Sequence, residues 1–62
     1  RSPQRRLIEL RIEHADLDDL IDRAGTERPM DDLALRRLKK RRLLLRDQIA
    51  SLEDSLDPPD LA

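Results

Sequence analysis

Leucine and isoleucine recur along two stretches of the chain at alternating intervals of three and four residues. This spacing places apolar side chains on one face of an α-helix, and its heptad form is typical of coiled-coil pairing. The pattern predicts one helix over residues 4–24 and a second over residues 32–56. The predicted helix-contact positions, two of which are polar, are Leu7, Leu10, His14, Leu17, Ile21, Leu35, Leu38, Arg42, Leu45, Ile49 and Leu52.

The first helix carries signals at both ends. Ser2 can cap it, and Pro3 is tolerated at the first helical position, where its missing N–H costs nothing. Gly25 follows the last apolar position, and a glycine in the left-handed conformation commonly ends a helix. We therefore expect Gly25 to end this helix and residues 25–31 to form a turn.

The second helix is bounded by an acidic residue and by two prolines. Asp31 is the expected N-cap, and Pro58 and Pro59 exclude further helix, which leaves residues 57–62 as a frayed tail. Two long helices joined by a short loop fold back on each other. The expected fold is all-α: residues 1–62 form a single antiparallel two-helix hairpin with coiled-coil-like packing.

Pairing the helices across the loop gives a consistent register. It sets Leu10 opposite Leu45 and places His14 beside Arg42, with Asp18 available as a partner for the arginine. A polar residue among apolar contact positions often fixes the register, which is our leading interpretation. A pH switch at His14 and a ligand or metal site are the alternatives. A metal site has the weaker support, because a single histidine in a chain without cysteine provides few of the usual metal ligands.

Apolar residues outside the contact positions predict a second interface. Two helices alone bury too little surface to offset the entropy lost on ordering, and an exposed apolar patch usually marks an interaction site. We expect a homo-oligomer, with a two-fold dimer of four helices favoured over a monomer that pairs only at high concentration. The residues expected to form a patch at the open end of the hairpin are Ile8, Ile12, Ala15, Leu43 and Leu44.

Charge is abundant but nearly balanced: 13 basic and 14 acidic residues give a net charge of −1. The second helix is the basic one, and we expect acidic residues of the first helix to lie beside most of its cations. Together with the absence of aromatic residues that could stack on bases, this makes nucleic-acid binding the alternative rather than the leading hypothesis. The candidate phosphate contacts are Arg36, Arg37, Lys40 and Arg41.

Catalytic chemistry finds little support in the composition. The chain has no cysteine, one histidine and one glycine, which excludes a disulfide, a thiolate metal site and a glycine-rich phosphate loop. We expect no catalytic residues, no cofactor and no metal. No apolar run approaches the roughly 20 residues of a membrane span, so we also expect no membrane partner. A chain without cysteine fits a reducing cytoplasm, which is the location we expect.

Several of these residues form a recognisable motif. His14, Leu17 and Asp18 precede a turn in which Pro29 stands before Asp32, and a longer motif follows, formed by Leu38, Lys39, Lys40, Leu43, Leu45, Asp47 and Ile49. Over roughly residues 7–52 the chain resembles the YdcH-like family of small bacterial proteins, a domain of unknown function. Arg41 replaces an acidic or polar residue of that pattern, and Arg42 and Arg46 replace lysines.

The resemblance implies a helical hairpin in a bacterial cytoplasmic protein and no particular activity. Taken with the contact pattern, it predicts a non-enzymatic, self-associating interaction module. An unidentified protein partner is a further possibility. The cellular role is left open.

Overall fold

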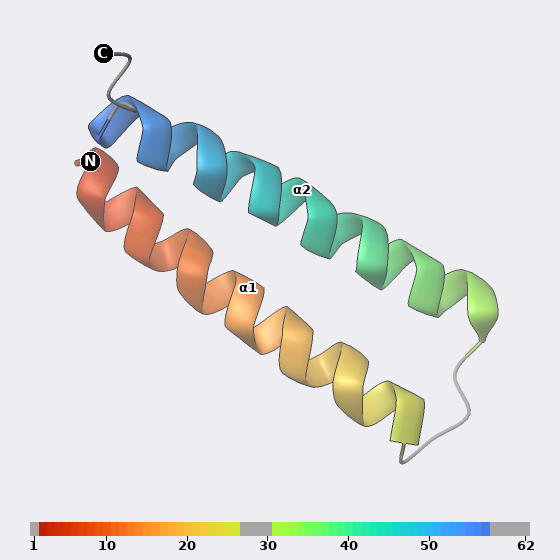
Figure 1. Ribbon diagram of the computed structural model, residues 1–62. Helices are drawn as coiled ribbons and strands as arrows, with labels where there is room; N and C mark the ends of the chain where they lie inside the picture. Colours follow the sequence, from red (N-terminus) through yellow and green to blue (C-terminus); the bar gives the residue numbers. More distant parts are fainter. Residues whose placement is uncertain (1, 27–30, 58–62) are drawn as a thin grey trace.

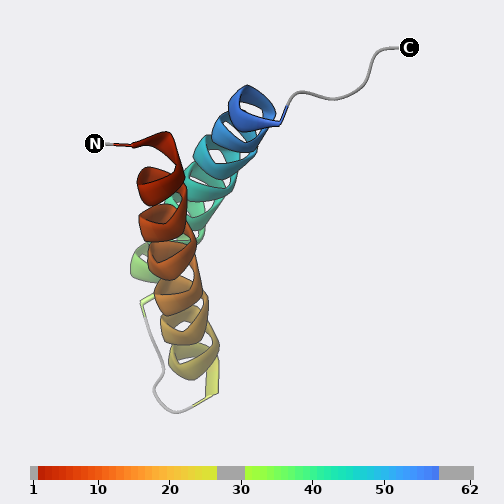
Figure 2. The same ribbon diagram turned by 90° about the vertical axis from the view of Figure 1, so that its left-hand side faces the viewer.

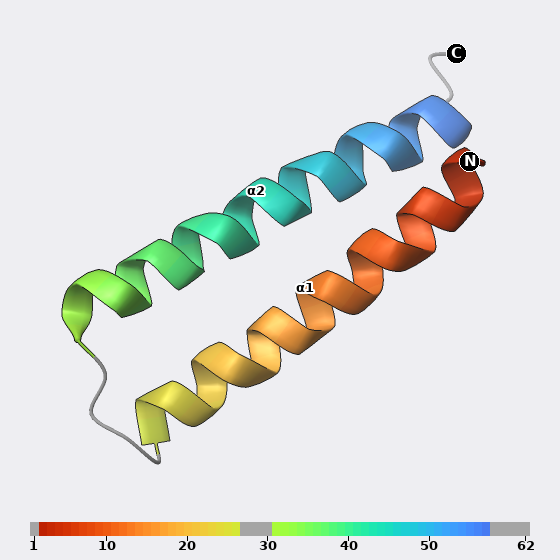
Figure 3. The same ribbon diagram turned by 180° about the vertical axis from the view of Figure 1, so that it is seen from behind.

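The computed structural model describes residues 2–26 and 31–57, which form two long helices. Helix α1 spans Pro3–Thr26 and helix α2 spans Asp32–Leu56. The helices lie side by side, with the first turn of α1 and the last turn of α2 at the same end (Figures 1 and 3). Their axes are inclined to each other (Figure 2). The predicted all-α two-helix hairpin is confirmed, and the described residues contain no strand.

The start of α1 follows from Ser2 and Pro3. The Ser2 hydroxyl accepts a hydrogen bond from the backbone N–H of Arg5 (3.1 Å), and the Ser2 carbonyl accepts one from Arg6 (3.1 Å). The first bond satisfies one of the N–H groups that lack an intrahelical partner, and the second is the first backbone bond of the helix itself. The cap therefore forms as its residues predict.

The end of α1 differs from the prediction. The helix continues through Gly25 to Thr26, and Gly25 does not adopt a positive φ. The Thr26 hydroxyl lies within hydrogen-bonding distance of the carbonyl oxygens of Asp22 (3.3 Å) and Arg23 (3.4 Å). The helix therefore ends at a threonine whose hydroxyl bonds back to the carbonyls of its last turn, and not at a left-handed glycine.

Helix α2 begins at a side-chain cap. The Asp31 carboxylate accepts a hydrogen bond from the N–H of Leu33 (3.0 Å), and the Asp31 carbonyl accepts one from Leu35 (3.0 Å). At the other end, the N–H of Asp57 donates to the carbonyl of Glu53 (2.8 Å). Most of the predicted turn and of the predicted tail lies outside the described residues.

The core between the helices is one thin layer of aliphatic side chains. Its best-buried member is Leu10, whose side chain is 2% exposed. Helix α1 contributes more of the buried residues than α2, which supplies only Leu45 to that group. The buried residues are Leu7, Leu10, Leu17, Ile21, Ala24 and Leu45, and those packed against them are Leu35, Leu38, Ile49 and Leu52.

Ion pairs between the helices follow their antiparallel order. Arg11, in the first half of α1, pairs with Glu53 near the end of α2 (2.7 Å). Asp18, nearer the loop, pairs with Arg42 (2.6 Å).

No helix in the described part of the chain is both long enough and apolar enough to cross a membrane.

Candidate functional site

A polar layer interrupts the aliphatic contact at the middle of the hairpin. The Arg42 guanidinium donates a hydrogen bond to the Asp18 carboxylate at 2.6 Å, so the predicted pairing is confirmed. His14 is half-buried next to this pair. Its Nε2 atom is buried and has no hydrogen-bond partner among the described residues.

This layer has the composition of a structural element. It offers one carboxylate, already bound to an arginine, and one imidazole. Within residues 2–26 and 31–57 no group of three or more histidine, aspartate or glutamate side chains is placed to hold a metal ion. A buried polar atom without a hydrogen-bond partner lowers the stability of a helix contact. Polar layers of this kind are nevertheless found in helix pairs, where they restrict the register in which the helices can pack.

Large apolar side chains are exposed on both helices. Ile8, Ile12, Leu43 and Leu44 are each more than half exposed, and Ala15 is exposed as well. Two further residues, Leu20 (44% exposed) and Leu33 (51%), were not predicted as surface positions. Their spacing could have revealed them, because Leu20 lies eight residues after Ile12 on the same helical ridge.

All five residues predicted to form a patch at the open end are exposed, and their directions around each helix differ. Successive residues of a helix point about 100° apart, so Leu43 and Leu44 face different sides of α2. Leu43 lines two hollows beside His14, and Leu44 lines neither of them. Ile12 lies two residues from Leu10 and two from His14, which turns it away from α2. We call the side of the hairpin that carries Leu20, Leu33 and Leu44 the Leu44 flank, with Ile12 at its edge. The side that carries Leu43 is the Leu43 flank.

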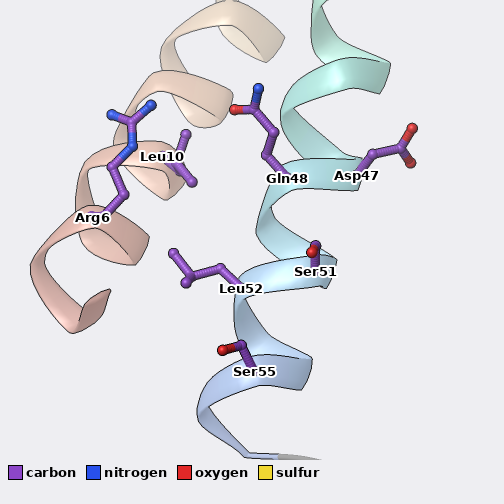
Figure 4. A pocket seen from close by; sticks show the side chains of 7 residues that line it. All are labelled: Arg6, Leu10, Asp47, Gln48, Ser51, Leu52 and Ser55. Carbon is purple, nitrogen blue, oxygen red and sulfur yellow. The ribbon is translucent and has the colours of Figure 1, made fainter. Parts of the chain in front are cut away.

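A shallow hollow opens between the helices on the Leu44 flank (Figure 4). Leu52 extends from α2 toward α1, where Leu10 and Arg6 lie, whereas Asp47 points away from α1. Ser51 and Ser55 also line this hollow, but the single histidine lines other hollows. The hollow therefore holds hydroxyl groups without a histidine placed to activate them.

The cations of α2 are less neutralised than the sequence suggested. Arg41 pairs with Glu13 (3.7 Å) and Arg42 with Asp18 (2.6 Å). Among the described residues no carboxylate lies within ion-pair distance of the other five: Arg36, Arg37, Lys39, Lys40 and Arg46. Among the described residues, ion pairs therefore engage two of the seven cations of α2.

The four candidate phosphate contacts differ in their surroundings. Arg36, Arg37, Lys40 and Arg41 are all exposed, but Arg41 is already engaged by Glu13. Lys39 and Arg46 were not among the candidates, yet both are exposed and line a hollow beside His14. Their seven-residue spacing, which puts them on one side of a helix, was the signal for this juxtaposition.

Comparison with family models places most of the chain within one match. The model described as "Protein of unknown function (DUF465)" matches residues 7–53. Comparison with curated proteins and with solved structures gave no match. The matched range contains the polar layer and most of the core residues.

Proposed function

The chain belongs to the DUF465 family of small bacterial proteins of unknown function, and we propose that it is a non-enzymatic interaction module that self-associates as a two-fold dimer. In this arrangement α1 of each copy packs against α2 of the other, so that four helices share one core. The family description carries no activity, so the proposal rests on the geometry of this chain.

The exposed aliphatic side chains carry the proposal. Leu33 and Leu44 are each more than half exposed on α2, and Leu20 and Ile12 lie on the same flank or at its edge. Fully burying one such side chain contributes about 1.5–3 kcal/mol. Because the hairpin core is a single thin layer, covering these residues would add substantially to the apolar surface removed from water.

Charge complementarity favours a second copy as the occupant of this flank. Helix α1 has four basic and six acidic residues, a net charge of −2, whereas α2 has seven basic and four acidic residues, a net charge of +3. When α1 of one copy packs against α2 of another, the excess negative charge of one helix faces the excess positive charge of the other. An isologous dimer forms this favourable contact twice.

Sedimentation velocity tests this proposal. The double variant Ile12→Glu with Leu44→Glu puts charge into the proposed contact on both helices, so a wild-type dimer should become a monomer at micromolar concentration. The control is Ala50→Glu, since Ala50 is exposed and lines a hollow on the Leu43 flank, outside the proposed contact. An unchanged sedimentation coefficient in the double variant, with helical content retained by circular dichroism, would show that this interface is wrong.

A nucleic-acid-associated role is the second candidate. Arg36, Arg37 and Lys40 are exposed and have no carboxylate within ion-pair distance in the described part of the chain. This role requires binding to single or double strands that weakens steeply as salt rises, with a further loss in Arg37→Ala combined with Lys40→Ala. If no binding occurs at low salt, this candidate is excluded.

Location and further partners complete the proposal. The resemblance to small bacterial proteins favours the cytoplasm. The Leu43 flank, which the dimer would leave open, is the surface available for another partner.

A further inference from the structure

A hollow on the Leu43 flank collects positive charge. Its volume is about 510 Å³, and α1 contributes His14 and Asp18 to its lining. A second hollow continues it along α2 and shares His14, Leu43 and Arg46. The carboxylates of that second hollow are Asp47 and Glu53, and Glu53 is paired with Arg11. The α2 residues that line the first hollow are Lys39, Arg42, Leu43 and Arg46.

The balance of charge in this hollow is positive. It contains three cations and one carboxylate, and the carboxylate of Asp18 is bound to Arg42 at 2.6 Å. Lys39 and Arg46 have no carboxylate within ion-pair distance among the described residues, which leaves two uncompensated charges. By contrast, the hollow in Figure 4 is lined by one cation and one carboxylate. The hollow beside Arg11 is lined by more carboxylates than cations.

The spacing of the two free cations suits an oxyanion. Lys39 and Arg46 are seven residues apart, about two turns or 10.5 Å along α2, and project from the same side of the helix. Both side chains are long enough for their charged ends to converge on one group between them. Arg42 lies between them in sequence, held by Asp18, and Leu43 supplies an apolar wall.

We propose that the groove formed by Lys39, Leu43 and Arg46 beside His14 binds phosphate groups. An ammonium and a guanidinium together give charge-assisted hydrogen bonds to phosphate oxygens, and the guanidinium can bind two oxygens at once. The hollow is also of the size that small ligands occupy. This site is separate from the proposed dimer contact, because its lining contains none of Ile12, Leu20, Leu33 and Leu44.

Titration of ¹⁵N-labelled full-length protein with pyrophosphate at low salt tests the site. Saturable shifts should concentrate at residues 39–46 and at the His14 ring. Lys39→Ala combined with Arg46→Ala should weaken binding at least tenfold. The matched control is Arg36→Ala with Lys40→Ala, which removes the same charge from exposed positions outside the hollow and should change affinity less than twofold.

A parallel titration with a short single-stranded oligonucleotide distinguishes the sources of phosphate. Tighter binding of the oligonucleotide with a steep salt dependence assigns the site to a nucleic-acid backbone, whereas equal or weaker binding assigns it to small phosphorylated ligands. Equal losses in both double variants, or the absence of saturable shifts, would overturn the proposal. The groove variant should keep the wild-type sedimentation coefficient, so failure of the dimer and failure of the groove give different results.

Discussion

Replacing His14 with leucine should stabilise the hairpin. The Nε2 atom of His14 is buried in the helix contact and has no hydrogen-bond partner among the described residues. A buried polar group without a partner costs about 1–3 kcal/mol. Leucine removes that cost and extends the aliphatic layer on either side of the position, where Leu10 and Leu17 are already buried.

The size of the effect follows from partial burial. Because His14 is half-buried rather than fully buried, we expect the His14→Leu variant to gain about 1–2 kcal/mol in the free energy of unfolding. For a chain of this length each kcal/mol raises the melting temperature by about 4–8 °C. Urea denaturation followed by circular dichroism should give a higher midpoint with an unchanged m-value.

Two controls separate burial from other causes. His14→Gln keeps polar atoms at the position while having a helix propensity similar to that of leucine, so it should bring no comparable gain. Measuring each variant at two protein concentrations separates hairpin stability from self-association. The reasoning fails if His14→Leu is no more stable than the wild type, or if His14→Gln gains as much.

Three further substitutions test the core, the polar layer and the α2 cap by the same denaturation assay. Leu10→Ala should cost about 2–4 kcal/mol, since Leu10 is 2% exposed. Leu43→Ala, at a position that is 56% exposed and outside the proposed dimer contact, should cost much less, and equal losses would contradict the core assignment. Asp18→Asn removes the charge that pairs with Arg42 and should cost about 0.5–1 kcal/mol of stability. Glu13→Gln should cost less, because the Glu13–Arg41 pair is longer and more exposed. A larger loss in Glu13→Gln than in Asp18→Asn would count against the polar layer. Asp31→Ala removes the N-cap of α2 and should cost about 1 kcal/mol of stability. Asp31→Asn should cost little, because asparagine also caps helices. Equal losses of stability in the two variants would argue against the cap.

The sequence predicts much of this fold because its information is local and periodic. The alternation of three and four residues places Leu10, Leu17 and Leu45 on contacting faces, and all three are buried. The caps at Ser2 and Asp31 depend on side-chain oxygens that bond to N–H groups two or three residues away. Both kinds of signal act within a few residues, so they survive the formation of tertiary structure.

Other features of the structure depend on the direction of a side chain and on its distance from groups on the other helix. The order of residues in the sequence describes both of these less well. Gly25 carries an end signal, but the helix continues to Thr26, whose hydroxyl lies within hydrogen-bonding distance of two carbonyls of the last turn. Leu43 and Leu44 are neighbours in sequence yet face different flanks. The acidic and basic character of the two helices is plain, but it does not reveal that Lys39 and Arg46 lack carboxylate partners in the described part of the chain.

Self-association is the central claim, and sedimentation equilibrium of the wild-type chain tests it most directly. The account predicts a mass of twice the 7.3 kDa chain at micromolar concentration, dissociating toward the monomer on dilution. A mass of 7.3 kDa at every concentration, with full helical content, would contradict it.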